Sequence, residues 1–351
     1  MISPQEFNLS GVAVPQDAGD MLDEICEHFV EHSSVERTDN LVLLRSEIGL
    51  AAIRAEDGKL LIDLTCPSEQ MLMLSRNIIA EHLFYFAGDD PFELDWAVPA
   101  APSALPDLRE VTVVSADDVT PHMRRVKLLC DDVTPFMGGE MHIRLLVPPK
   151  GRTPVWPTFQ PDGRTAWPDG DDELVVRVYT IRAIDVERQE LWVDFLQHPA
   201  PGVKTPGADF ARDAKAGDRI AILGPGGGGV PQAKTILLVG DESALPAIAR
   251  IAAQVSAETK IQAIVEVMDE AEQQPLPSAG VIDVRWLHRK TNPPGAANIL
   301  TDAALEAIAA MDEDTYVWVA CEKEDVRTIR RVLKKRGHDR KRMYVAWYWE
   351  K

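Results

Sequence analysis

Cysteine is scarce in this chain, and long apolar runs are missing. The 351 residues include only Cys26, Cys66, Cys130 and Cys321, and none of them forms a C-x-x-C pair. A disulfide framework or a zinc site is therefore not expected, and the pattern favours reduced thiols in the cytoplasm. No apolar run reaches about 18 residues, so no membrane span is predicted. The polar and acidic residues 1–20 do not have the pattern of a secretory signal.

Basic residues are also fewer than acidic residues. The chain has 37 Lys and Arg residues against 56 Asp and Glu residues, which gives a net charge of −19. This balance argues against nucleic acid and anionic membrane surfaces as partners. An anionic substrate therefore requires a local basic pocket, for which the candidates are Lys334, Lys335, Arg340 and Arg342. The alternative is that these residues only complement the dipole at the end of a helix.

Three patterns of secondary structure follow one another along the chain. Helix-like and strand-like segments predict a small α+β domain, short strands between Gly, Pro and Asp turns predict an antiparallel barrel, and alternating strands and helices predict a parallel α/β sheet. A stretch rich in Ala and Pro reads as a linker, and a long Pro- and Gly-containing loop interrupts the barrel. The expected ranges are 15–95 (α+β), 96–107 (linker), 108–230 (barrel), 148–172 (loop) and 231–351 (α/β).

One predicted barrel strand, residues 177–182, carries a pattern suited to nucleotide binding. Side chains alternate along a strand, so Arg177 and Tyr179 point to the same face. A guanidinium suits a phosphate, and a phenol ring suits a planar heterocycle. The alternative is an ordinary strand with an exposed arginine and a half-buried tyrosine.

Two further turns are candidates for binding phosphate. Residues 201–208 lead from a strand into a short helix, where Gly202, Lys204 and Thr205 offer backbone and side-chain donors. Residues 240–246 follow a buried strand at the place where parallel sheets bind nucleotides. A plain connecting loop is the alternative for the first turn, and an N-cap at Ser243 is the alternative for the second. The four glycines at 226–229 are interpreted as a hinge between two domains.

These segments, taken in this order, resemble the siderophore-interacting FAD-binding family, which includes NAD(P)H-dependent ferric-siderophore reductases. The resemblance covers about residues 111–349, and residues 28–87 resemble a small domain of unknown function that is sometimes fused to such proteins. The motifs that carry it are R-V-Y-T-I-R (177–182), V-D-F-L-Q-H (193–198), A-G-D-R-I-A-I-L-G-P (216–225), G-D-E-S-A-L-P-A-I (240–248), W-L-H-R (286–289), W-V-A-C-E (318–322) and Y-V-A-W-Y-W (344–349).

The resemblance implies a ferredoxin-reductase-like fold in which the chemistry belongs to the cofactors rather than to a catalytic side chain. Electrons are expected to pass from NADPH, or NADH, through FAD to a ferric siderophore. The expected cofactor-binding residues are Arg177, Tyr179, Thr180, Arg182, Asp194, Phe195, His198, Gly202, Lys204, Thr205, Asp241, Glu242, Ser243, Ala244, Pro246 and Trp349. The chain departs from the family at 206–211, where a Trp-Ala pair is common, and at Cys321, where glycine is usual.

Several alternatives stay open at this point. Glu266 favours NADH, because an acidic group there can hold a ribose hydroxyl, whereas Arg285, Arg289 and Lys290 favour NADPH. A general flavin reductase that serves a redox protein or a quinone fits the same motifs, and so does a siderophore-binding module without activity. No metal site is expected, since His28 and His32 share a helix face but have no further ligand nearby. The siderophore, the oligomeric state and the role of the first domain are not predicted.

Overall fold

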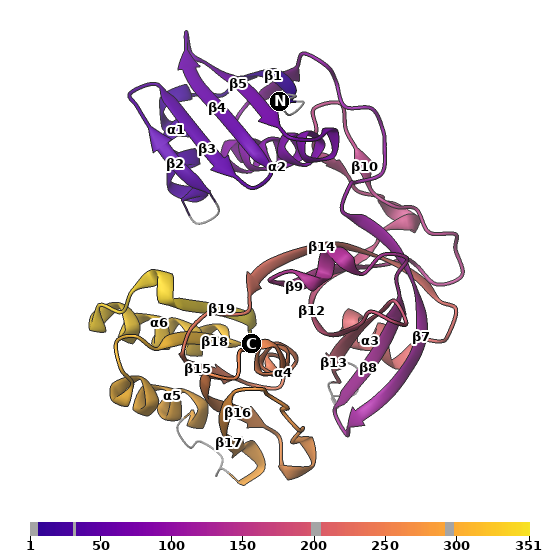
Figure 1. Ribbon diagram of the computed structural model, residues 1–351. Helices are drawn as coiled ribbons and strands as arrows, with labels where there is room; N and C mark the ends of the chain where they lie inside the picture. Colours follow the sequence, from indigo (N-terminus) through magenta and orange to yellow (C-terminus); the bar gives the residue numbers. More distant parts are fainter. Residues whose placement is uncertain (1–5, 31–32, 198–204, 292–297) are drawn as a thin grey trace, which may run out of the picture. The chain divides into compact units, whose positions relative to one another are not determined.

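The computed structural model describes residues 6–30, 33–197, 205–291 and 298–351 (Figure 1). These residues form two compact units, the first from residues 1–108 with 150–174, and the second from residues 109–149 with 175–351. None of the helices in the described ranges has the length and apolar character that a membrane crossing needs.

The first unit contains a six-stranded antiparallel sheet with two helices on one face. Its strands lie in the order β2-β3-β4-β5-β1-β6. Leu60, Ile62 and Leu64 alternate with more exposed residues along β5, so one face of the sheet is buried under the helices. The elements are β1 (Phe7–Val14), α1 (Ala18–Phe29), β2 (Ser34–Arg37), β3 (Leu41–Ser46), β4 (Gly49–Glu56), β5 (Lys59–Cys66), α2 (Glu69–Ala87) and β6 (Glu93–Trp96).

The expected α+β unit is present, and two features extend it. Strand β1 precedes the expected start at residue 15 and pairs with both β5 and β6. The long barrel loop also packs here: the Asn77 amide donates to the Gly163 carbonyl at 2.9 Å, and Trp96 Nε1 donates to the Asp162 carbonyl at 2.7 Å. The loop contains the short elements β10 (Thr158–Phe159), β11 (Thr165–Ala166) and η2 (Gly170–Asp172).

The second unit begins with a closed antiparallel barrel in the strand order β12-β13-β8-β7-β14-β9. Its interior is filled by apolar side chains such as Val126, Ile143, Ile181 and Phe195. The elements are β7 (Leu108–Thr120), β8 (Met123–Leu129), η1 (Thr134–Met137), β9 (Glu140–Val147), β12 (Val175–Asp185), β13 (Glu190–Leu196), α3 (Pro206–Asp213) and β14 (Arg219–Gly229).

The rest of the second unit is a five-stranded parallel sheet in the order β17-β16-β15-β18-β19. Helix α4 packs on one face with the barrel residue Met141, and α5 and α6 pack on the other, so the predicted parallel α/β sheet has helices on both faces. The elements are β15 (Thr235–Gly240), α4 (Leu245–Gln254), β16 (Lys260–Val267), η3 (Glu270–Glu272), β17 (Val281–His288), η4 (Arg289–Thr291), α5 (Ile299–Ala310), β18 (Tyr316–Glu322), α6 (Lys323–Arg336), η5 (Arg340–Arg342) and β19 (Met343–Trp349).

The glycine run at 226–229 differs from the predicted hinge. It is the end of strand β14 and pairs with β9 through Gly226 and Gly229. Two of its glycines pack closely against aromatic rings. A Cβ at Gly227, whose φ is +77°, would lie 2.6 Å from His142 Nδ1, and a Cβ at Gly228 would lie 2.6 Å from Tyr344 Cε2. The run therefore serves as a close-packing surface for two aromatic rings.

The contact between barrel and parallel sheet is made by α4 and β12. Arg250 of α4 is 1% exposed, and its guanidinium donates to the carbonyls of Ile181 at 3.1 Å and Phe136 at 2.9 Å. This side chain fixes the motif strand β12 against the α/β domain. The carboxyl ends of all five parallel strands meet at one edge of the sheet, where nucleotides bind in open α/β sheets.

Candidate functional site

Strand β12 presents the predicted Arg177–Tyr179 pair. Arg177 is exposed, and its guanidinium donates to the carbonyl of its neighbour Val176 at 2.7 Å. Tyr179 is half-buried, with its ring centroid 4.2 Å from that of Phe195, and burial raises the pKa of its phenol to about 12. The phenol is therefore neutral, and the strand offers a cation beside an aromatic ring.

Thr180 and Arg182 follow on the same strand. Thr180 is 5% exposed and lies directly opposite His142 of β9 in the strand register. Arg182 has a buried Nε without a hydrogen-bond partner among the described residues. Burial also lowers the pKa of this guanidinium. An unsatisfied buried donor is costly, and it marks a position where a ligand acceptor is favourable.

The predicted residues Asp194 and Phe195 are neighbours on β13, and both are buried. Asp194 is held by Arg125, whose Nε and Nη2 donate to its two carboxylate oxygens at 2.6 and 2.8 Å. Phe195 is fully buried and supports the ring of Tyr179. These two side chains shape the site through Arg125 and Tyr179.

The turn before α3 is described only in part. His198, Gly202 and Lys204 lie outside the described residues, and Thr205 is the N-cap residue of α3, with its amide donating to the Asp209 carboxylate at 3.1 Å. Gly207 in the first turn of α3 is in tight contact with Tyr179. A Cβ at this position would lie 1.9 Å from the Tyr179 Oη.

The turn after β15 is organised by Asp241. Its carboxylate accepts from the Ser243 amide at 2.8 Å and hydroxyl at 2.5 Å, and from Trp349 Nε1 at 2.7 Å. The N-cap residue of α4 is Ala244, so Ser243 does not have the predicted alternative role of N-cap. Asp241 thus joins the first turn of the α/β domain, which includes Pro246, to the last strand of the chain.

A cluster formed by Arg289 and two glutamates occupies the same edge of the sheet. Arg289 donates to the Glu266 carboxylate at 2.7 Å and also pairs with Glu242. Burial raises the pKa of the Glu242 carboxyl, and the hydrogen bond from Arg289 opposes that effect. Glu266 and Arg289, which the sequence assigned to opposite nucleotide preferences, therefore form one cluster.

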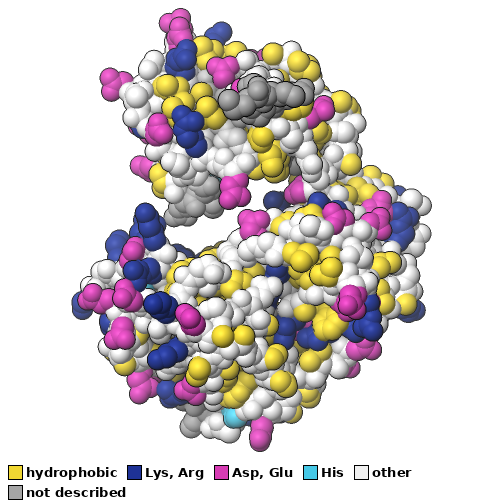
Figure 2. All heavy atoms as spheres, viewed as in Figure 1, with side chains coloured by type: hydrophobic (Ala, Val, Ile, Leu, Met, Phe, Trp, Pro, Cys, Tyr) yellow, Lys and Arg dark blue, Asp and Glu magenta, His cyan; other side chains and the backbone are white. Residues whose placement is uncertain are grey.

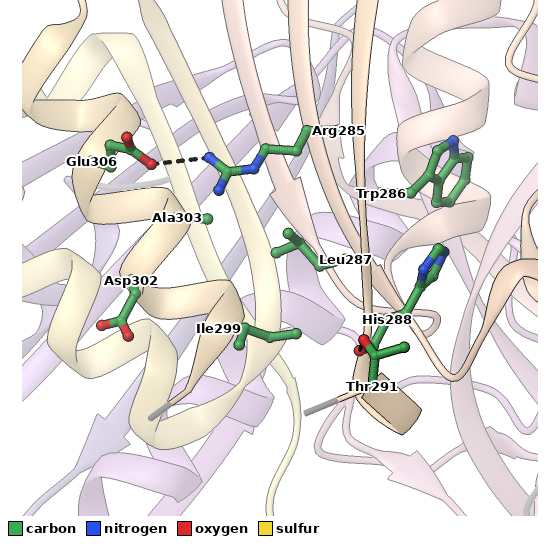
Figure 3. Close-up of a pocket in the computed structure, with 9 residues that line it drawn as sticks. All are labelled: Arg285, Trp286, Leu287, His288, Thr291, Ile299, Asp302, Ala303 and Glu306. Atoms are coloured by element: carbon green, nitrogen blue, oxygen red, sulfur yellow. Dashed lines mark hydrogen bonds and ion pairs between the residues drawn. The ribbon is translucent and has the colours of Figure 1, made fainter. Parts of the chain in front are cut away.

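The other two basic side chains predicted to favour NADPH, Lys290 and Arg285, also have acidic partners. Lys290 pairs with Asp269, and Arg285 donates to Glu306 at 3.0 Å. Arg285 and Leu287 point from β17 towards α5, into a pocket of about 630 Å³, while Trp286 and His288 point to the other side of the strand (Figure 3). The remaining lining residues are Thr291, Ile299, Asp302, Ala303 and Glu306.

The predicted substrate residues Lys334, Lys335, Arg340 and Arg342 are not brought to this site. Helix α6 starts at Lys323, directly after the carboxyl end of β18, and runs back along the sheet for 14 residues, or about 21 Å at 1.5 Å per residue. Its last turn and η5 therefore lie at the opposite, amino-terminal edge. Lys and Arg side chains are interspersed with Asp and Glu side chains on this part of the surface (Figure 2). The helix-dipole alternative agrees with this placement.

Two residues at the site were not singled out from the sequence: Arg125 and His142. His142 Nε2 and the Tyr348 hydroxyl lie 2.7 Å apart, and the two side chains come from β9 and β19. Burial, and secondarily the charge of Arg250, lowers the pKa of His142 to about 4, so the ring is neutral at physiological pH. The described residues contain no group of three His, Cys, Asp or Glu side chains arranged for a metal ion.

Three family models match consecutive parts of the chain. Residues 112–229 match the siderophore-interacting FAD-binding domain, and residues 233–351 match the siderophore-interacting protein domain. Residues 11–97 match an uncharacterized protein conserved in bacteria (DUF2218). Among curated proteins, the chain is 27% identical over 240 residues to the ferric vibriobactin reductase of Vibrio cholerae, covering 66% of this chain and 86% of the relative.

Solved structures extend the match to the fold. A siderophore utilization protein from T. fusca is 30% identical with a TM-score of 0.55, and the match covers 70% of this chain and 93% of that protein. The siderophore-interacting protein SipS from Aeromonas hydrophila is 28% identical with a TM-score of 0.56, covering 70% and 92%. The ferredoxin-NADP+ reductase from Plasmodium falciparum, at 13% identity and a TM-score of 0.50, shares the fold over 68% of this chain and 95% of its own. The predicted ferredoxin-reductase-like fold is confirmed.

Proposed function

Because this chain belongs to the siderophore-interacting family of FAD-binding proteins, we propose that it is an oxidoreductase that passes electrons from NAD(P)H through FAD to a ferric siderophore. The observation that carries the proposal is strand β12, which holds Arg177, Tyr179 and Thr180 and is joined through Arg250 to helix α4 of the α/β domain. The four cysteines are free thiols, in keeping with a cytoplasmic site of action.

Three features of the barrel fit FAD. Arg177 places an exposed guanidinium on the strand that carries Tyr179, in reach of a phosphate. The buried Nε of Arg182 lacks an acceptor among the described side chains and backbone groups. Gly207 leaves room for the Tyr179 hydroxyl at the start of α3, so the ring can stay in place beside a planar ligand. When bound, FAD accepts a hydride from reduced nicotinamide and gives single electrons to an acceptor.

The protein's own residues bind and orient the reactants. The ring of Tyr179, supported by Phe195, restricts the position of the flavin, and Arg177 holds its phosphates. The Asp241–Trp349 hydrogen bond fixes the turn that faces the nicotinamide nucleotide. Ferrous iron binds hard oxygen ligands more weakly than ferric iron does, so reduction releases the metal from a siderophore without any acid or base from the chain.

The substrate is tested by iron release. Flavin-loaded protein with NADPH is incubated anaerobically with a set of ferric siderophores and a ferrous chelator, and chelate formation is followed by absorbance. We expect turnover with at least one ferric siderophore and slower turnover with a ferredoxin or a quinone. Turnover with a redox protein alone would identify a general flavin reductase. Siderophore binding by flavin-free protein without iron release would identify a binding module.

NADPH is proposed as the preferred donor, with Arg289 as the residue that binds its 2′-phosphate. Arg289 lies at the end of β17 and bridges Glu242 and Glu266, so a phosphate must take over one of these contacts. Replacing Arg289 by glutamine is expected to lower kcat/KM for NADPH by about tenfold or more, as the loss of a charge-assisted bond predicts. The kcat/KM for NADH should change less than that for NADPH. Arg331→Gln, at an exposed arginine on α6, is the control, and an equal loss with both nucleotides would contradict this role.

A further inference from the structure

Three strands of the second unit bring polar side chains together beside Thr180. Thr180 on β12 and His142 on β9 are directly opposite partners, so their side chains lie on the same face of the barrel. His142 Nε2 is 2.7 Å from the hydroxyl of Tyr348 on β19. The Tyr348 hydroxyl also interacts with the hydroxyls of Thr180 and Tyr344. The last strand of the α/β domain thus reaches the barrel strand that carries the flavin motif.

These groups are shielded from water. His142 is 7% exposed and Thr180 is 5% exposed. Burial lowers the pKa of His142 to about 4 and raises the pKa of Tyr348 well above its usual range, so both rings are neutral over the physiological range. A neutral phenol has one proton to donate, and a neutral imidazole has one nitrogen that donates and one that accepts. The hydrogen bonds of the cluster can therefore keep one donor-to-acceptor order while every side chain in it stays neutral.

The glycine run of β14 keeps this cluster in place. His142 packs on Gly227 and Tyr344 packs on Gly228, with no space for a Cβ at either position. The ring of Tyr344 is stacked on Trp318 at a centroid distance of 5.6 Å, and Trp318 also meets the edge of Tyr348. Because both faces of the cluster are closely packed, the Tyr348 hydroxyl is restricted to the position between His142 and Thr180.

We infer that Tyr348 is a positioning residue for electron transfer: His142 Nε2 donates to its oxygen, it donates to Thr180, and the Thr180 hydrogen is left for the reactive edge of FAD, near which the family resemblance places Thr180. This inference rests on the proposed function. A hydrogen bond donated to that edge stabilises the reduced cofactor, because negative charge develops there on reduction. Without the phenol hydroxyl, the Thr180 hydroxyl can rotate away from the cofactor.

The test compares Tyr348→Phe with two substitutions at His142. Tyr348→Phe and His142→Phe are expected to keep FAD bound and to slow its anaerobic reduction by NADPH about tenfold, the equivalent of one hydrogen bond. The midpoint potential of the flavin should become more negative by about 30 mV, which is a tenfold change for a two-electron couple. His142→Gln keeps an N–H donor near the position of Nε2 and should restore both values towards wild type.

Tyr85→Phe, at a 77% exposed phenol in the first unit, is the matched control. A lower Tm for Tyr348→Phe with an unchanged midpoint potential and reduction rate would show a structural role only and overturn the inference. His142→Gln behaving like His142→Phe would also overturn it. If wild-type protein itself bound no FAD, or bound FAD that NAD(P)H did not reduce, the proposed function would fail first, and the two failures are therefore distinguishable.

Discussion

Replacing Gly207 by alanine is expected to weaken FAD binding by about tenfold or more, because the substitution moves the aromatic ring that supports the flavin. An added Cβ would lie 1.9 Å from Oη, 2.7 Å from Cζ and 2.9 Å from Cε2 of Tyr179. These distances are far inside van der Waals contact, so the ring must leave its position over Phe195. The tenfold loss corresponds to about 1.4 kcal/mol, within the range of one well-placed aromatic contact. Fluorescence titration of flavin-free protein with FAD measures the change.

Gly139→Ala is the matched control for this substitution. A Cβ at Gly139 would meet nothing within 4 Å, and its φ is not in the left-handed region. The control should bind FAD as the wild type does, and Tyr179→Ala should reproduce the loss seen with Gly207→Ala. Unchanged FAD affinity in both Gly207→Ala and Tyr179→Ala would remove Tyr179 from the binding site.

Substitution of Arg250 by methionine is expected to lower the free energy of unfolding by about 3 kcal/mol, since buried carbonyls lose a charged donor. The guanidinium is 1% exposed and donates to the carbonyls of Ile181, Phe136 and Glu140. Burial lowers the pKa of this side chain to about 10, so its desolvation cost offsets part of the loss. Urea denaturation followed by tryptophan fluorescence gives the difference in stability.

Arg331→Met, at an exposed position on α6, should leave the unfolding midpoint unchanged. Because Arg250 joins α4 to β12 and to the residues before β9, its loss should also separate the unfolding of the barrel from that of the α/β domain. A single transition at the wild-type midpoint in Arg250→Met would show that these bonds contribute no net stability.

The sequence carries a strong signal where an element is long and its apolar pattern is regular. The run at 235–240 is buried on both faces as strand β15, and the alternation of strands and helices after it leads directly to the observed parallel sheet. Strand β1 was missed because its inward positions are Leu9, Gly11 and Ala13, which are small or isolated and give weak alternation. Its partners β5 and β6 lie about 50 to 80 residues away in sequence, so only tertiary pairing reveals it.

The candidate site shows the same difference between residues with a local sequence signal and residues that only tertiary contacts bring together. Motif residues such as Arg177, Tyr179 and Asp241 could be proposed because their chemistry is visible in a short stretch of sequence. His142 was missed because it lies 206 residues from its partner Tyr348 and acquires a role only when β9 and β19 meet. The basic segment at 334–342 was assigned to the substrate on charge alone. The topology of a parallel α/β sheet already places the end of α6 at the edge away from the nucleotide site.

The most direct test of the central claim is the visible spectrum of the purified protein, reconstituted with FAD if necessary, before and after anaerobic addition of NADPH. We predict the absorption bands of a bound oxidised flavin, their bleaching by NADPH, and their recovery when a ferric siderophore is added. Protein that does not retain FAD, or a bound flavin that neither NADPH nor NADH reduces, would contradict the account.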